Sequence, residues 1–205
     1  MTIARRRIQS ELRGYFLDQT LDPGVKIEVR NGDFMNLKGI IKGVEGTPYE
    51  GGTFELEIKI GTDYPYKPPT IKFLTKIWHP HVNPFNGTIC LEDADNGVWP
   101  VSMSVYKVLL LIQSWMTKID DKQPIDVEIL HQATNNTQVF NTTAEFWAIK
   151  FAGARKPASQ ELLKKVQLLT PVARNEVFAV IALSYHNWEL PNDIHEETIQ
   201  KYLAH

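Results

Sequence analysis

The sequence contains a single cysteine, Cys90, among its 205 residues. One thiol cannot form a disulfide bond within the chain, so no covalent cross-link helps to hold the fold together. Secreted proteins often rely on such bonds, whereas the cytosol and the nucleus keep thiols reduced. We therefore expect a cytoplasmic or nuclear protein.

Long apolar runs and a strong net charge are also missing. No stretch approaches the ~20 apolar residues that a membrane-spanning helix needs, and the N-terminal segment has arginines but lacks the apolar centre of a secretory signal. The formal net charge is -2, which gives no general attraction to nucleic acid or to an anionic membrane. We therefore expect neither nucleic acid nor a membrane among the partners.

The N-terminal part of the chain shows two kinds of apolar periodicity. Apolar residues at helical spacing, with arginines on the opposite face, predict an amphipathic helix over residues 2–17. Apolar and polar residues then alternate in segments that predict four strands, at 25–29, 37–44, 54–60 and 70–77. Their connections are short and rich in turn-forming residues, which favours an antiparallel meander.

Residues 78–103 form a long stretch without periodicity, and long ordered loops in compact domains are usually functional. Beyond it, apolar spacing predicts three helices, at 105–116, 125–134 and 137–151. Ser102 or Ser104 is the expected N-cap of the first of them. The expected class is α+β, with an N-terminal helix, a four-stranded antiparallel meander sheet, a long functional loop and C-terminal helices.

The end of the sequence predicts a small additional domain. Residues 153–158 are mostly small or polar and include a proline, which is typical of a linker. Residues 159–205 then contain three helical patterns, the last two at 176–185 and 194–204, with apolar residues of their own. At about 45 residues this unit lies near the lower size limit for independent folding. We expect it to fold separately from residues 1–152.

Cys90 stands in a polar segment, HPHVNPFNGTICLEDAD, at 79–95. A buried structural cysteine prefers apolar surroundings, and a hydrolase nucleophile needs cationic neighbours that stabilise its thiolate. Here Glu92, Asp93 and Asp95 follow the thiol, and nearby carboxylates raise the pKa of a cysteine. The segment therefore fits neither of these two kinds of cysteine.

Four motifs around this segment resemble those of the ubiquitin-conjugating enzyme family, in order and at the family's separations. They are TPYEGG at 47–52, YPYKPP at 64–69, KIWHP at 76–80 followed by NGTICL at 86–91, and the pair Trp99 and Pro100. The sequence is most similar to the branch with a C-terminal ubiquitin-associated domain. The resemblance implies a ubiquitin-conjugating catalytic domain at 1–152 and a ubiquitin-associated-like three-helix domain at 159–205.

The resemblance implies a transferase with a cysteine thioester intermediate. Cys90 would accept ubiquitin from the ubiquitin-activating enzyme and pass it to a lysine of a substrate protein, together with a ubiquitin ligase. Exchange between two thioesters is nearly balanced, so an acidic setting suits such a carrier better than it suits a hydrolase. The resemblance implies neither a metal nor another cofactor.

The resemblance also assigns supporting and contact roles to residues outside the thiol. It implies that three residues hold the active-site loop: His79, Pro80 and Trp99. It implies that five exposed residues contact the activating enzyme or the ligase: Arg5, Arg6, Tyr66, Pro100 and Ser102.

The sequence departs from the family at its usual His-Pro-Asn triplet, which is His79-Pro80-His81 here. The family's asparagine supports the oxyanion that forms when an amine attacks the thioester. A histidine ring can also donate an N–H, so we predict that His81 replaces this catalytic donor. A metal site formed by His79, His81 and Cys90 is an alternative, although no other ligand cluster accompanies it.

A second departure concerns the acid that many family members place before a proline after the long helix. Gln123 precedes Pro124 at this place. Lysine has a solution pKa of ~10.4, so a nearby group must orient and deprotonate it. Asp121 is one catalytic candidate for this role, and Glu92 and Asp93 beside the cysteine are the alternatives.

A third departure lies in the expected ubiquitin-associated domain. Such domains usually carry Met-Gly-Phe or Met-Gly-Tyr between their first two helices, whereas this sequence has Val172-Ala173-Arg174. We therefore expect weak ubiquitin binding by the tail.

Three other functions stay open from the sequence. The chain resembles the non-catalytic cofactors that share this fold, but those characteristically lack the cysteine. It is also compatible with a carrier of another ubiquitin-like modifier. A cysteine hydrolase is the third alternative, although no recognisable nucleophile motif supports it.

Overall fold

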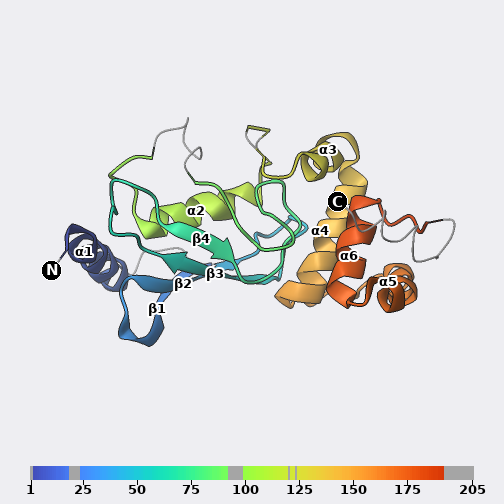
Figure 1. Ribbon diagram of the computed structural model, residues 1–205, viewed down its shortest axis with the longest axis horizontal. Coiled ribbons are helices and arrows are strands. Elements are labelled where there is room, and N and C mark those ends of the chain that lie inside the picture. Colours follow the sequence, from blue (N-terminus) through green and yellow to red (C-terminus); the bar gives the residue numbers. More distant parts are fainter. Residues whose placement is uncertain (1, 19–23, 92–98, 120, 123, 192–205) are drawn as a thin grey trace.

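The computed structural model describes residues 2–18, 24–91, 99–119, 121–122 and 124–191, and it confirms the predicted α+β class (Figure 1). Its elements in chain order are α1 (Ile3–Leu17), β1 (Val25–Val29), the 3-10 helix η1 (Arg30–Gly32), β2 (Asn36–Lys42), β3 (Thr53–Lys59), β4 (Thr70–Phe73), α2 (Val105–Trp115), α3 (Val127–Asn135), α4 (Thr137–Ala152), α5 (Gln160–Ala173) and α6 (Glu176–Tyr185).

The four strands form one sheet in the order β1-β2-β3-β4, and every neighbouring pair is antiparallel. The predicted meander is therefore confirmed. Alternate side chains are buried on one face, which α2 covers (Figure 1). Gly39 lies on this face, and a Cβ there would come within 2.8 Å of Leu109 Cδ2. The glycine thus allows α2 to approach β2 closely.

β4 is shorter than the predicted strand at 70–77, because it ends at Phe73. The amides of Leu74 and Thr75 both donate to the carbonyl oxygen of Glu55, at 2.8 and 3.3 Å. Thr75 Oγ1 also accepts a hydrogen bond from the Glu55 amide at 2.9 Å. Two successive amides that share one acceptor interrupt the regular ladder, so the chain leaves the sheet here.

Short polar side chains begin the helices, as helix capping requires. Ser104, rather than Ser102, caps α2 and accepts a hydrogen bond from the Lys107 amide. α4 ends at Gly153, whose φ of 73° is the left-handed conformation that glycine adopts without strain. Among the described residues, no single helix is long and apolar enough to span a membrane, and the α5–α6 pair is bent by 116°.

Helix α6 packs directly against α3 and α4, and α5 packs against α6 (Figure 1). Ser184 of α6 is fully buried, and its Oγ accepts a hydrogen bond from Trp147 Nε1 of α4 at 2.8 Å. Gln132 Nε2 of α3 donates to the Ser184 carbonyl oxygen at 3.0 Å. Beyond α6, Trp188 Nε1 donates to Thr143 Oγ1 of α4 at 2.8 Å. The two parts of the chain therefore share one core.

This packing differs from the expectation of a self-contained tail. The sequence pattern shows that the tail has apolar residues, but it does not show which neighbours they contact. Within 153–158, Ala154 is buried and Lys156 pairs with Glu145 at 3.0 Å, so this segment is also docked. The boundaries at 152, 153–158 and 159 stay predictions, and the expected helix at 194–204 lies outside the described residues.

Replacing Ser184 by alanine is expected to destabilise the whole chain by about 1–3 kcal/mol, because it leaves the buried indole N–H of Trp147 without an acceptor. Denaturant unfolding followed by tryptophan fluorescence measures this loss. Ser114→Ala is the matched control, since the Ser114 hydroxyl is exposed and donates only to Leu111 of its own helix. An unchanged main transition in Ser184→Ala would contradict the shared core.

Candidate active site around Cys90

His79 is 1% exposed, and both of its ring nitrogens have partners within the protein. Nε2 lies 3.0 Å from the carbonyl oxygen of Trp115, and Nδ1 accepts a hydrogen bond from the His81 amide at 3.1 Å. Because a carbonyl oxygen only accepts, Nε2 carries the proton and the ring is neutral. Burial lowers the His79 pKa to about 3. The ring ties the loop to the end of α2 and has no lone pair left for a metal or a substrate proton.

Acidification is expected to destabilise the fold partly through His79. Its pKa is about 3 in the folded state and ~6.5 in the unfolded chain, so the unfolded state binds the proton first. The stabilisation is complete above pH ~6.5 and is lost as the pH falls towards 3, by about 1.4 kcal/mol per pH unit.

Denaturant unfolding at pH 7 and pH 5 tests this contribution of His79. The difference between the two pH values should be smaller in His79→Gln than in the wild type, whereas the exposed control His131→Gln should keep the wild-type difference. If His79→Gln does not fold, NMR of the wild type supplies the measurement. A His79 ring that titrates above pH 5 would contradict the argument.

Two further hydrogen-bonded contacts hold the loop that contains His79. Tyr49, from the TPYEGG motif, is buried and donates its hydroxyl proton to the carbonyl oxygen of Trp78 at 2.8 Å. The carbonyl oxygen of Pro80 accepts hydrogen bonds from the amides of Ile125 and Asp126, at 2.9 and 3.0 Å. These bonds fasten the loop to the turn after β2 and to the start of α3.

Gly87 sets the path of the chain towards Cys90. Its carbonyl oxygen accepts a hydrogen bond from the Phe73 amide at 2.8 Å, and Thr88 then forms an antiparallel bridge with Lys72. The φ of Gly87 is 78°, and a Cβ there would lie 2.1 Å from the Phe73 carbonyl oxygen. Only glycine fits this close approach without a shift, so it positions the segment against β4.

Cys90 follows this bridge and is exposed to solvent. Its thiol is therefore accessible to another macromolecule, as a carrier of a protein modifier requires. The three acids that were expected to raise its pKa are Glu92, Asp93 and Asp95, and all three lie outside the described residues. Their effect on the thiol stays a prediction.

His81 and Asp121, the two other catalytic candidates, occupy different surroundings. His81 is 8% exposed, and its ring centroid lies 5.1 Å from that of Trp115. Asp121 is exposed on the segment between α2 and α3, and the end of this segment is bound to Pro80. The catalytic roles of both residues stay predictions. Within the described ranges, no three His, Cys, Asp or Glu side chains are grouped as metal ligands.

The N-terminal arginines divide into two kinds. Arg5 and Arg6 are exposed on α1, as a contact for a partner requires. Arg7 is half-buried, and its guanidinium pairs with Glu11 at 2.5 Å and donates to the Met103 carbonyl oxygen at 3.4 Å. The spacing of Arg7 and Glu11, one helical turn, is a signal in the sequence that indicates such a pair.

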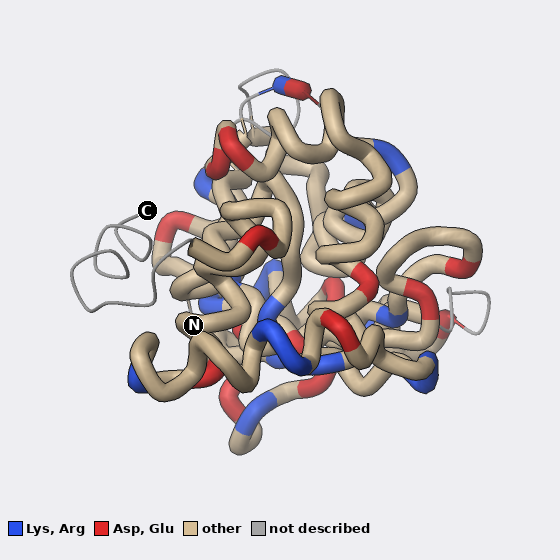
Figure 2. The backbone as a smooth tube through the Cα atoms, turned by 90° about the vertical axis from the view of Figure 1, so that its right-hand side faces the viewer, with Lys and Arg blue, Asp and Glu red and all other residues tan. Residues whose placement is uncertain are grey.

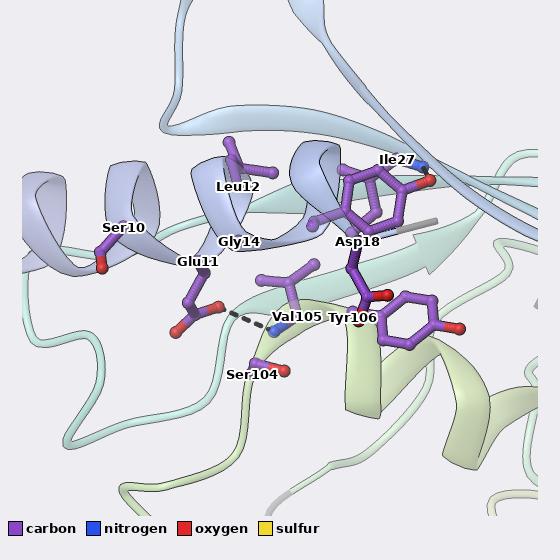
Figure 3. A pocket seen from close by; sticks show the side chains of 10 residues that line it. Ser10, Glu11, Leu12, Gly14, Asp18, Ile27, Ser104, Val105 and Tyr106 are labelled. Atoms are coloured by element: carbon purple, nitrogen blue, oxygen red, sulfur yellow. Dashed lines mark hydrogen bonds between the residues drawn. The ribbon is translucent and has the colours of Figure 1, made fainter. Parts of the chain in front are cut away.

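Glu11 connects α1 to the start of α2. Its Oε2 accepts a hydrogen bond from the Val105 amide at 3.0 Å, as the dashed line in Figure 3 shows. Its Oε1 accepts a hydrogen bond from the Tyr64 hydroxyl at 2.7 Å. The carboxylate thus stabilises the N-terminus of α2 and holds the segment before Tyr66. The sequence reasoning missed this role of Glu11.

The expected ligase edge consists of two loops that lie side by side. Trp99 Nε1 donates to the carbonyl oxygen of Pro65 at 2.8 Å, which joins them. Tyr66 is 65% exposed beside this contact, Pro100 is half-buried and Ser102 is exposed. The structure therefore brings these residues to one edge, while their contact with a ligase stays a prediction.

Comparison with known proteins agrees with this arrangement. Residues 7–148 match the family model described as "Ubiquitin-conjugating enzyme". The chain is 38% identical to ubiquitin-conjugating enzyme E2 21 of Caenorhabditis elegans, over 82% of this chain and 78% of that protein. It is 35% identical to ubiquitin-conjugating enzyme E2 K of Homo sapiens, over 92% of this chain and 94% of that protein.

A solved structure shows the same likeness. The E2 domain of a Toxoplasma gondii ubiquitin conjugating enzyme superposes with a TM-score of 0.63 at 36% identity, covering 72% of this chain and 98% of that one. The family model covers the sheet, Cys90, α2, α3 and most of α4. The chain belongs to the ubiquitin-conjugating enzyme family.

Proposed function

We propose that the protein accepts ubiquitin from the ubiquitin-activating enzyme as a thioester on Cys90 and transfers it, with a ubiquitin ligase, to a lysine of a substrate protein. The observation that carries the proposal is the position of Cys90, which is exposed directly after a segment that Gly87 fixes against β4. We also propose that the protein acts in the cytoplasm or the nucleus.

The loading step exchanges one thioester for another. The Cys90 thiolate attacks the carbonyl carbon at the C-terminus of ubiquitin, a bond to Sγ forms, and the bond to the sulfur of the activating enzyme breaks. That sulfur leaves with the electron pair and takes up a proton. The two thiols have similar reactivity, so Cys90 needs no strong activation by a neighbouring base.

The discharge step makes an amide. The neutral ε-amine of a substrate lysine attacks the same carbonyl carbon, and a tetrahedral intermediate with a negatively charged oxygen forms. The C–S bond then breaks, the amine loses a proton, and Cys90 is regenerated. We assign His81 to stabilise the negatively charged oxygen by hydrogen bonding. We assign Asp121 to orient and deprotonate the incoming lysine, because lysine must lose its proton near neutral pH.

Arg5 and Arg6 are proposed contacts for the activating enzyme, and the edge formed by Tyr66, Pro100 and Ser102 is the proposed contact for the ligase. Exposed charges add little to stability but raise association rates strongly at low salt. Arg7 is left out of the contact set, because its guanidinium is bound to Glu11.

The tail is proposed to be a ubiquitin-associated-like domain with weak affinity for ubiquitin. In the Val172-Ala173-Arg174 segment, Ala173 is buried and Val172 is half-buried. Arg174 has a positive φ of 57° and ends α5. Little apolar surface of this segment is thus presented to a partner.

Incubation with ubiquitin, ATP and an activating enzyme, followed by a non-reducing gel, tests the proposed function. An adduct that disappears on addition of a thiol supports it. A failure to form any adduct would overturn it in favour of a non-catalytic cofactor. The same gel with other ubiquitin-like modifiers distinguishes ubiquitin from its relatives, and cleavage of a ubiquitin thioester without transfer would indicate a hydrolase.

A further inference from the structure

A groove with a volume of about 330 Å³ lies between the end of β4 and the loop that leads to Cys90. We call it the β4 groove, and it is lined by residues 72–74, 76–77 and 82–87. Its walls are polar and apolar in nearly equal measure, and Leu74 and Phe85 are partly exposed there, at 43% and 38%. Lys72 and Lys76 add two positive charges to it.

Neither lysine is neutralised by the carboxylates of the neighbouring strand. Glu57 stands opposite Lys72 in the sheet register, but its carboxylate pairs with Lys59 at 3.0 Å and with Arg30 at 3.7 Å. Glu55 of the same strand pairs with Lys38 at 2.6 Å. Basic and acidic residues lie interspersed over much of the molecule (Figure 2).

Lys76 is held in place by carbonyl oxygens, and no carboxylate in the part of the chain that the structure describes pairs with it. Its Nζ donates to the carbonyl oxygens of Pro84 and Phe85, at 3.3 and 3.1 Å. An ammonium group has three N–H donors, so the contacts within the described residues leave one for a ligand. Burial and the charge of Lys72 lower the Lys76 pKa, which is the direction expected when two like charges are held together. An anion between them would relieve this repulsion.

The β4 groove is close to the reacting thiol. Thr88 lies opposite Lys72 in the antiparallel bridge, where opposed Cα atoms are roughly 4.5–5.5 Å apart. Cys90 follows two residues later, and two residues span at most about 7 Å. Lys72 and Cys90 therefore lie within roughly 13 Å between their Cα atoms, a distance that three to four residues of an extended substrate cover, at about 3.3–3.6 Å each.

We propose that the β4 groove binds an acidic side chain of the substrate, an Asp or Glu within about four residues of the acceptor lysine. Lys72 and Lys76 bind the carboxylate through charge-assisted hydrogen bonds, and Leu74 and Phe85 contact the neighbouring apolar part of the peptide. The groove thus selects among substrate lysines. This inference rests on the proposed transfer from Cys90.

Peptides with a single lysine test the selection. The full-length protein is loaded with ubiquitin, and its discharge is followed at increasing concentrations of peptides that carry Glu two to four residues from the lysine. Matched peptides carry Gln at the same positions. The Glu peptides are expected to show a KM about threefold to tenfold lower, and this preference should shrink as the salt concentration rises.

Variants separate the groove from general charge effects. Lys72→Gln is expected to lose most of the preference for Glu peptides, and Lys72→Glu is expected to reverse it in favour of peptides with Arg at those positions. Lys26→Gln is the matched control, because Lys26 is an exposed lysine on β1, at the opposite edge of the same sheet. It should keep the wild-type preference.

The outcomes separate this inference from the proposed function. If the wild type forms no thioester, the proposed function fails. If it loads and discharges but treats Glu and Gln peptides alike, the role of the β4 groove is overturned while the proposed function stands. An equal loss of preference in Lys72→Gln and Lys26→Gln would overturn it as well, because net charge alone would then explain the effect.

Discussion

Replacing Cys90 by serine is expected to convert the ubiquitin adduct from a thioester into an oxygen ester that survives reductant. Cys90→Ala is expected to form no adduct at all. Cys90 is the only cysteine in the chain, so no second thiol replaces it, whereas a serine hydroxyl attacks the same carbonyl carbon and forms the more stable ester.

Gels run with and without thiol, together with intact-mass measurement, distinguish these adducts. Cys90 is exposed, so both substitutions should change the free energy of unfolding by no more than about 0.5 kcal/mol. Equal unfolding curves therefore serve as the control for folding. A thiol-sensitive adduct on Cys90→Ala would contradict the assignment of the thioester to this residue.

The sheet shows how much of this fold periodicity alone predicts. The alternation in β1, β2 and β3 marks their buried face within one or two residues of the observed ends, because that face depends on side-chain direction along each strand. The end of β4 was not predictable in this way. It depends on hydrogen bonds of Leu74 and Thr75 with Glu55, almost twenty residues earlier in the chain.

The packing of the tail against α3 and α4 was not predictable from the sequence, for a similar reason. Trp147 and Ser184 are 37 residues apart, and neither residue type indicates which residue it will contact. An apolar helix face shows that a surface is buried, but not against which element. The sequence therefore predicts the helices α5 and α6 and leaves their packing open.

In the candidate site, too, contacts between residues far apart in the chain were not predictable from the sequence. Motif resemblance proposed Cys90, His79 and the two loops of the expected ligase edge, because each is marked by a short run of neighbouring residues. It did not identify the contact of Glu11 with Val105, which joins residues 94 positions apart. It also did not indicate that Arg7, unlike Arg5 and Arg6, is paired within the chain, although Glu11 lies one helical turn away.

His81→Ala is expected to slow discharge to free lysine by about 10²–10³, the usual cost of losing one oxyanion donor. Loading should slow far less, because it exchanges one thioester for another. His81→Asn should keep most of the discharge rate, since the amide N–H donates in place of the imidazole. Single-turnover discharge of the purified thioester, separated from loading, gives both rates.

A structural role for His81 predicts a different result, and a third variant distinguishes the two. The His81 ring packs against Trp115, with centroids 5.1 Å apart, so alanine removes this packing together with the N–H donor. His81→Phe keeps an aromatic ring at this position but has no N–H. If His81 is the oxyanion donor, His81→Phe discharges as slowly as His81→Ala although its unfolding curve resembles that of the wild type. Discharge by His81→Phe at the wild-type rate would show that His81 acts through its packing and would contradict the donor role.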